Sequence, residues 1–197
     1  RMPPTRERRA GRDTRLRSAP PLAETGALSD AGGQPGLSDR FLRWVLRSSL
    51  LPFVLRLKLN KMLCSRGPHG AYRTRVGQFI YQGVPRNLID NHVYYLGMYE
   101  PAIAEAMRFC ARAIPELNTQ AFVDIGANTG LFTLVGAGLF TTVHAFEPYP
   151  PVFARPDGHV RLHALGTVPP YPVGLGAQRG GLPFLAHELT NQCTLHF

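Results

Sequence analysis

The spacing of apolar residues between positions 101 and 115 predicts the clearest helix of the chain. Apolar side chains recur there at offsets of three and four, at Ile103, Ala106, Met107, Cys110 and Ile114. This period is typical of an amphipathic helix, and a proline is favoured at a first helical position. We therefore predict a helix that begins at Pro101 and stops before Pro115, with Met107 and Cys110 in the core.

After position 120 the pattern changes to short apolar runs separated by helical segments. Residues 120–124, 141–146 and 171–175 have the length and composition of strands. A helix is predicted over about 129–139, short or frayed because Gly136 and Gly138 each cost about 1 kcal/mol relative to alanine. A second helix over 152–162 is predicted to be interrupted at Pro156-Asp-Gly158, and 182–185 to pair with 194–197. This alternation predicts an α/β fold with a parallel, doubly wound sheet.

The first 70 residues are predicted to contain two further regions. Residues 1–38 are rich in Arg, Pro, Gly, Ser and Ala and are expected to be a disordered arm, because they cannot bury enough apolar surface. Residues 39–66 are predicted to be a basic amphipathic helical segment, capped by Asp39 and broken or kinked at Pro52. A peripheral membrane contact through 41–63 is one interpretation of this segment. Packing on the domain or on a partner is the other, because its charges do not gather on one face.

Residues 71–197 are assigned to the N-terminal part of an α/β domain. Its first part, 71–95, is predicted to consist of short extended pieces that are separated by Gly77 and Gly83. The tyrosines and valine at 93–95 belong to this extended region in the prediction.

Charge and composition exclude few functions. The formal net charge is +9, but seven arginines lie in the first seventeen residues, so the charge describes the arm more than the domain. Such an arm can bind nucleic acid or anionic lipid, although a solvated tail is the simpler interpretation. Three scattered cysteines and the pair His159 and His163 supply no complete metal site. No apolar stretch reaches about 18 residues, so no transmembrane helix is predicted and a cytoplasmic location is expected.

The candidate chemistry lies in Phe122-Val-Asp-Ile-Gly-Ala-Asn-Thr-Gly130 and in Val143-His-Ala-Phe-Glu-Pro148. The first run predicts a strand, a glycine turn and the start of a helix. Glycines in such a turn allow the backbone to approach a ligand closely. Glu147 ends the next strand about 20 positions after Gly126, which is the spacing expected of an acid that binds ribose hydroxyls.

The acid before the turn favours one kind of adenosine cofactor. Asp124 would crowd a pyrophosphate, which requires helix N-termini without a nearby anion. A cationic sulfonium with an amino group has the opposite preference, so the pattern favours S-adenosylmethionine. An NAD(P)-binding oxidoreductase remains an alternative, and so does a glycine turn that serves only strand-to-helix packing.

These two runs resemble the FkbM family of S-adenosylmethionine-dependent methyltransferases. Gly97-Met-Tyr-Glu-Pro101 is similar to a further element of that family, and the resemblance covers about 90–197. It implies a class I, Rossmann-like methyltransferase fold and O-methylation of a hydroxyl on a sugar or another small-molecule or glycan acceptor. It also implies a set of cofactor-binding residues: Asp124, Gly126, Ala127, Asn128, Thr129 and Gly130 in the turn, Glu147 with Pro148 at the ribose, Leu175 near the adenine, and Glu100 over the pocket.

The resemblance also implies a strand that this sequence does not contain. Family members carry an Asp-x-Glu-Gly-type element on the next strand, and none occurs before Phe197. We therefore expect an incomplete sheet in which the strand at 121–123 is an open edge. We also expect weak or absent cofactor binding and no catalysis by this chain alone, with the catalytic residues unassigned. The alternative function is that of a non-catalytic remnant or interaction protein whose open sheet edge is covered by a partner.

Overall fold

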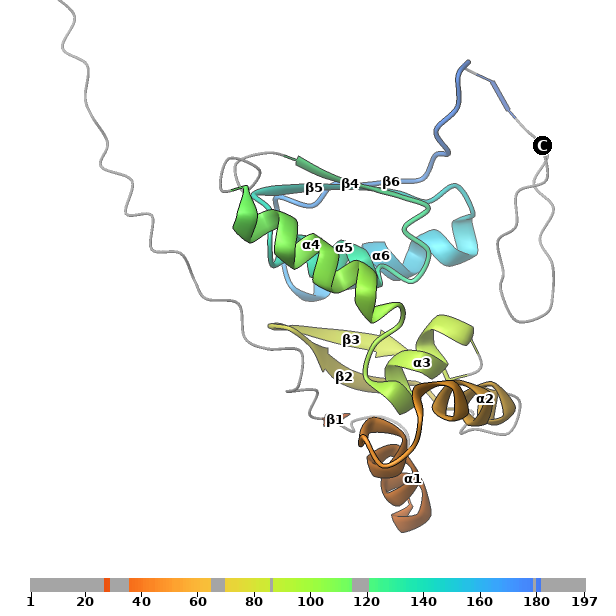
Figure 1. The fold of residues 1–197 in the computed structure, drawn as a ribbon. Coiled ribbons are helices and arrows are strands. Elements are labelled where there is room, and N and C mark those ends of the chain that lie inside the picture. Colours follow the sequence, from red (N-terminus) through yellow and green to blue (C-terminus); the bar gives the residue numbers. More distant parts are fainter. Residues whose placement is uncertain are drawn as a thin grey trace, which may run out of the picture.

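The protein has a mixed α/β fold in which a parallel sheet and an antiparallel sheet are separated by helices. The computed structural model describes residues 27–28, 36–64, 70–85, 87–114, 121–178 and 180–181. In Figure 1 the parallel sheet lies at the top, with helices α4, α5 and α6 beneath it. The antiparallel strands and α3 follow below these helices, and α1 and α2 lie at the opposite end. The hairpin predicted over 182–197 lies outside the described residues, as does most of the predicted arm.

The parallel sheet contains the first two predicted strands and a shorter version of the third. Its strands are β4 (Ala121–Ile125), β5 (Thr142–Phe146) and β6 (Pro170–Tyr171), in the order β4-β5-β6. All neighbouring strands run parallel. Within the described chain β4 pairs with β5 alone, as expected for an open edge. The third strand has two residues, since the chain bends away at 172 instead of remaining paired to 175.

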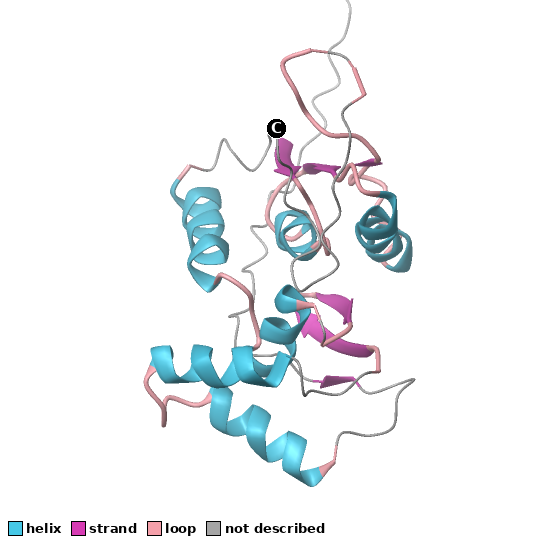
Figure 2. Ribbon diagram, turned by 90° about the vertical axis from the view of Figure 1, so that its right-hand side faces the viewer, coloured by secondary structure: helices cyan, strands magenta, loops and turns pink. Residues whose placement is uncertain are grey.

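Three helices cover one face of this sheet: α4 (Pro101–Ala113), α5 (Leu131–Ala137) and α6 (Pro150–Leu162). Both views show them on the same side (Figures 1 and 2). A Cβ on Gly136 would lie 2.6 Å from Cδ1 of Phe122, so the glycine that shortens α5 also lets that ring pack closely on the helix. The predicted interruption of α6 is wrong: the helix continues through Pro156, which is buried against the turn before α5.

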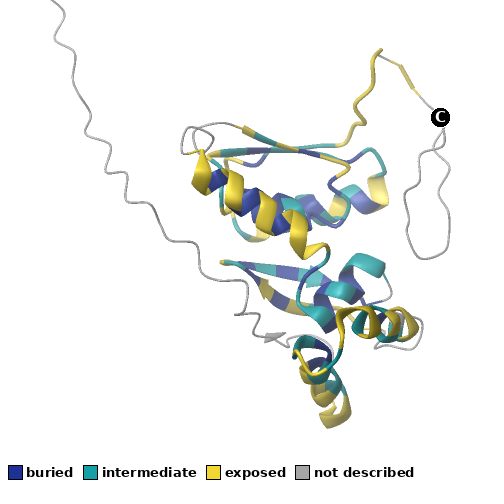
Figure 3. Ribbon diagram, viewed as in Figure 1, coloured by how far each residue is buried: buried dark blue, intermediate teal, exposed yellow. Residues whose placement is uncertain are grey.

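The bounds predicted for α4 are confirmed, but the predicted buried stripe is wrong for most of its members. The helix buries Ala104, Met107, Arg108 and Ala111. Met107 therefore packs in the core as predicted, whereas Cys110 is exposed. The physical reason is that α4 lies beside the β4 edge, where only the stripe toward α5 is covered. Figure 3 shows its outer side exposed.

The region 71–97 contains a hairpin and a helix, whereas only extended pieces were predicted. Strands β2 (Tyr72–Val76) and β3 (Phe79–Gly83) pair antiparallel around Gly77, which adopts φ 59°. Residues 93–95 belong instead to helix α3 (Leu88–Leu96). Asn87 caps this helix by accepting a 2.9 Å hydrogen bond from the Ile89 amide, and Gly97 ends it in the left-handed conformation. These two caps stabilise a helix in a segment of strand-favouring residues.

The N-terminal helical segment is divided at Pro52 as predicted, into α1 (Leu37–Arg47) and α2 (Phe53–Cys64). Asp39 is not the N-cap, because α1 begins two residues before it and Asp39 instead accepts a hydrogen bond from the Tyr94 hydroxyl. The disordered arm is also corrected at two places: α1 begins at Leu37, and a short strand β1 (Ala27–Leu28) pairs with β2. Apolar side chains of β2, β3, α3, α4 and α5 share one core, which joins the hairpin to the helices under the parallel sheet.

Candidate ligand-binding site

The glycine turn between β4 and α5 wraps over the carboxyl end of β5. Gly126 and Gly130 adopt positive φ angles of 79° and 77°, and Asn128 has φ 47°. The backbone N–H groups of residues 126 and 127 both donate to the carbonyl of Phe146, each over 2.9 Å. The turn is therefore fixed to the neighbouring strand at the edge of the sheet where open α/β folds bind ligands.

Gly130 is also the place where α6 approaches the turn most closely. A Cβ at this position would lie 2.9 Å from Cα of Pro156, a backbone atom that cannot swing aside. At Gly126 no atom lies within 4 Å of the corresponding position. The two glycines share the same backbone conformation but differ in the space around them.

We predict that Gly130→Ala destabilises the protein by about 2–3 kcal/mol, whereas Gly126→Ala costs about 1 kcal/mol. Both variants carry the strain of a left-handed alanine, and only the first adds a collision with α6. Urea denaturation of the two variants and the wild-type protein measures the difference. Equal losses would show that α6 does not pack against the turn.

Two buried carboxylates form hydrogen bonds with the turn and with the residues that flank it. Asp124, on β4, accepts a 2.6 Å hydrogen bond from the Thr133 hydroxyl on α5. Glu147, after β5, accepts from the backbone N–H of Asn128 over 2.9 Å and of Tyr149 over 3.0 Å. Burial raises the pKa of Asp124 and the charge of Glu147 adds to this, while the Thr133 hydrogen bond opposes the rise. Both acids thus bind protein groups that shape the turn.

A pocket of about 370 Å³ opens beside the turn, between β4 and α4. Tyr99 and Glu100 line it from the start of α4, and Glu100 itself adopts the left-handed conformation. The apolar part of the wall includes Ile103, Met107 and Phe122. The pocket therefore combines a polar backbone turn with an apolar wall, as small-molecule sites usually do.

The structure brings six of the ten predicted cofactor residues to this pocket: Glu100, Asp124, Gly126, Ala127, Asn128 and Thr129. Gly130 forms the N-cap of α5 next to it. Glu147 is almost fully buried and its carboxylate accepts the Asn128 N–H, so it is not exposed for a ribose contact in this structure. Pro148 and Leu175 do not line the pocket, and Leu175 is half exposed beyond β6.

The charges around the pocket are acidic. Among the described residues, its lining contains the carboxylates of Glu100 and Asp124 and no lysine, arginine or histidine. Burial raises the pKa of Tyr99 and the neighbouring Glu100 adds to the rise, so this phenol stays neutral near pH 7. A pocket of this kind favours a cationic ligand over a phosphate.

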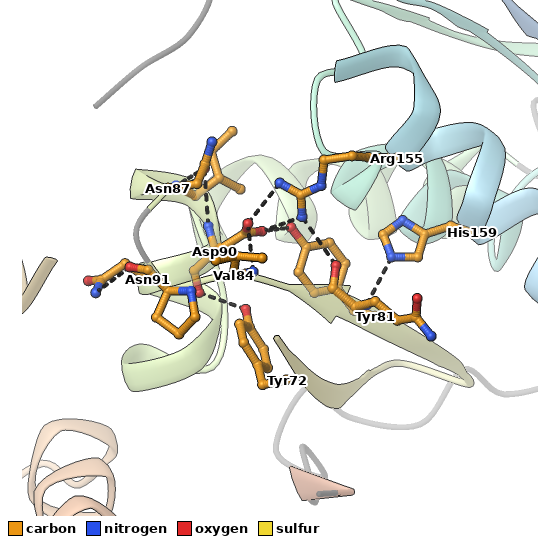
Figure 4. A network of polar contacts seen from close by, with 11 residues as sticks. Tyr72, Tyr81, Val84, Asn87, Asp90, Asn91, Arg155 and His159 are labelled. Carbon is orange, nitrogen blue, oxygen red and sulfur yellow. Dashed lines mark hydrogen bonds and ion pairs between the residues drawn. The ribbon is translucent and has the colours of Figure 1, made fainter. Parts of the chain in front are cut away.

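A second polar cluster connects the turn region to the antiparallel hairpin (Figure 4). Asp90 of α3 is completely buried, and Arg155 of α6 lies 2.7 Å from its Oδ2. The same carboxylate accepts hydrogen bonds from the Tyr81 hydroxyl and, over 3.0 Å, from the Val84 N–H. These contacts fasten α6 to α3 and β3 one residue before the proline that packs against Gly130.

The two histidines with metal-like spacing bind backbone instead. Nε2 of His159 accepts a 2.9 Å hydrogen bond from the Gln82 N–H, and His163 contacts the backbone of Ile80. The His159 ring stacks on Tyr81 at 4.9 Å. Among the described residues, no group of three or more His, Cys, Asp or Glu is placed to hold a metal ion.

Comparison with known proteins finds no family model and no curated protein that matches this chain. Of the helices in the described part of the chain, none is both long and apolar enough to cross a membrane. The geometry and charge of the pocket are therefore the observations that bear on function.

Proposed function

We propose that the pocket beside the glycine turn binds S-adenosylmethionine and that the protein is a methyltransferase of the class I, Rossmann-like type, related to the FkbM family. The observation that carries this proposal is the acidic pocket on a glycine turn at the carboxyl end of a parallel strand. A sulfonium and an amino group both carry positive charge, and the two carboxylates suit them, since no described residue of the lining is basic. A dinucleotide would place two phosphates in the same acidic surroundings.

The order of the strands supports the same proposal. In a class I methyltransferase the strand before the glycine turn is followed outward by the second and third strands, and β4, β5 and β6 have this order. The acceptor that we propose is a hydroxyl on a sugar or another small molecule. Transfer then breaks the bond from sulfur to methyl while the hydroxyl oxygen forms a bond to the same carbon, and a general base takes the hydroxyl proton.

Calorimetric titration with S-adenosylmethionine, S-adenosylhomocysteine and NADH tests the proposal. We expect only weak binding of the first two ligands, because within the described chain β4 is an open edge and the site lacks one wall, and no binding of NADH. Glu100→Gln, which removes one negative charge from the pocket, is expected to weaken S-adenosylmethionine binding by about three- to tenfold. The effect on S-adenosylhomocysteine should be smaller, because its sulfur is uncharged.

Glu105→Gln is the matched control, because Glu105 is an exposed glutamate on the same helix but does not line the pocket. Equal effects of the two substitutions would mean that Glu100 acts only through the overall charge. Binding of NADH would favour an oxidoreductase.

No binding of any of these ligands at millimolar concentration would favour the non-catalytic interaction protein. The exposed side chains of Val123 and Ile125 on the open β4 strand support that second candidate.

A further inference from the structure

Helix α1 has two apolar faces, and the described part of the chain covers only one of them. Its inner face, with Leu42 and Leu46, packs against Tyr94 and Tyr95 of α3. Its outer face carries Leu37, Phe41 and Trp44, whose exposed fractions are 83%, 65% and 59%. These three residues are spaced by four and three, so they lie along one side of the helix.

Further apolar side chains are exposed in the connection after α1 and on α2. Leu50 in the connection and Phe53, Val54 and Met62 of α2 are each more than half exposed. Figure 3 shows these outer sides exposed, and Figures 1 and 2 both place α1 and α2 at the end of the molecule opposite the parallel sheet. We call the exposed side chains of Leu37, Phe41, Trp44, Leu50, Phe53, Val54 and Met62 the basal surface. Exposed apolar side chains that gather at one end of a molecule are typical of an interaction site.

Two arginines of α1 pack inward against α3. Arg43 lies over the Tyr94 ring at 4.4 Å, and Arg47 donates a 2.7 Å hydrogen bond to the Tyr94 carbonyl. Both therefore point inward and hold α1 on the end of α3. Because these two arginines point inward while Arg40 is exposed, the basic residues do not gather on one face of the helix.

The charges that remain around the basal surface are basic. Arg40, Lys58 and Lys61 are exposed beside it. The only acidic residue between positions 36 and 64 is Asp39, which accepts a hydrogen bond from the Tyr94 hydroxyl. The surface thus presents aromatic and aliphatic side chains flanked by positive charge.

We propose that the basal surface docks on membranes that contain anionic lipids, with Phe41 and Trp44 inserted at the level of the headgroups. Aromatic side chains favour the membrane interface, and exposed lysine and arginine favour anionic headgroups. A protein partner would instead present acidic side chains to these basic residues, and its binding would not require lipid. This inference does not depend on the cofactor that the pocket binds.

Trp44 is the only tryptophan of the chain, so its fluorescence reports directly on the proposed surface. Vesicles of phosphatidylcholine with one quarter phosphatidylglycerol are expected to shift the emission to shorter wavelength and to bind the protein in flotation. Brominated lipids in the same vesicles should quench the emission. Pure phosphatidylcholine vesicles should bind the protein more weakly, because they carry no net negative charge. High salt should also weaken binding, because it screens the attraction between the basic residues and the anionic headgroups.

The variant Leu37→Ser/Phe41→Ser keeps the fluorescent reporter and is expected to bind at least about tenfold more weakly. Removing Lys58 and Lys61 should weaken binding by about fivefold for each lysine. The matched control is Phe109→Ser, which replaces a phenylalanine that is 70% exposed on α4, away from the basal surface, and should leave binding unchanged. Circular dichroism verifies that each variant is folded.

Three outcomes would overturn the proposal. The first is the absence of binding to anionic vesicles. The second is binding without a change in Trp44 emission, which would assign the contact to the arginine-rich chain before α1. The third is a shift that depends on protein concentration without lipid, which would identify a second copy of the chain as the occupant.

Discussion

Replacing Asp90 with alanine is expected to lower the free energy of unfolding by about 3–5 kcal/mol, the cost of breaking a buried ion pair on one side. In the wild-type protein Nη1 of Arg155 lies 2.7 Å from Oδ2 of Asp90. The substitution leaves this guanidinium without its carboxylate. It also removes the acceptor of the Tyr81 hydroxyl and of the Val84 N–H. Each buried donor left without a partner adds to the loss. Urea denaturation followed by circular dichroism measures the change.

The same helix provides the matched control for this prediction. Asp157 forms a 2.8 Å ion pair with Arg161, whose side chain is 79% exposed. Asp157→Ala should therefore change stability by no more than about 0.5 kcal/mol, because exposed pairs contribute little. The double variant Asp90→Leu/Arg155→Met should be less destabilised than the sum of the single variants, since it removes both charges together. A loss for Asp90→Ala as small as that for Asp157→Ala would refute the buried network.

The elements that the sequence predicted correctly are those whose signals are local. Helix α4 is bounded by Pro101 and Pro115, and the strands β4 and β5 are short apolar runs on either side of a glycine turn. Helix α3 was missed because valine and tyrosine favour strands, and the Asn87 and Gly97 caps that stabilise the helix were not recognised. The continuity of α6 was missed because buried packing of Pro156 against Gly130 compensates for the lost backbone hydrogen bond.

The candidate site could be predicted where its residues belong to one motif. The turn residues 126–129 and the acid Asp124 lie together in the sequence and in the pocket. The Asp90–Arg155 pair joins residues 65 positions apart, and no periodicity connects them. A single aspartate within the apolar segment 88–96 was the only available signal, and it identifies no partner. Glu147 was assigned from spacing alone, which cannot show that both its oxygens bind backbone N–H groups.

Acidification from pH 6.5 to about 4 is expected to remove about 3 kcal/mol of stability through His159 alone. Burial, aided by the positive charge of Arg155, lowers the pKa of this imidazole from 6.5 to about 4. In this range the unfolded imidazole binds a proton and the folded one does not. The unfolded state therefore holds more protons, and stability falls as the pH falls. The geometry agrees, since Nε2 already accepts the Gln82 N–H and a proton there would face another donor.

The variant His159→Gln isolates this contribution, because glutamine does not titrate. The difference in unfolding free energy between the wild-type protein and the variant should change across the range from pH 6.5 to about 4 and become constant below it. Other groups that titrate in the same range are common to both proteins and cancel in the difference. Proton NMR of the His159 ring gives the pKa directly. A titration near 6.5 would mean that water reaches this ring, and hence that the contact between α6 and the hairpin opens in solution.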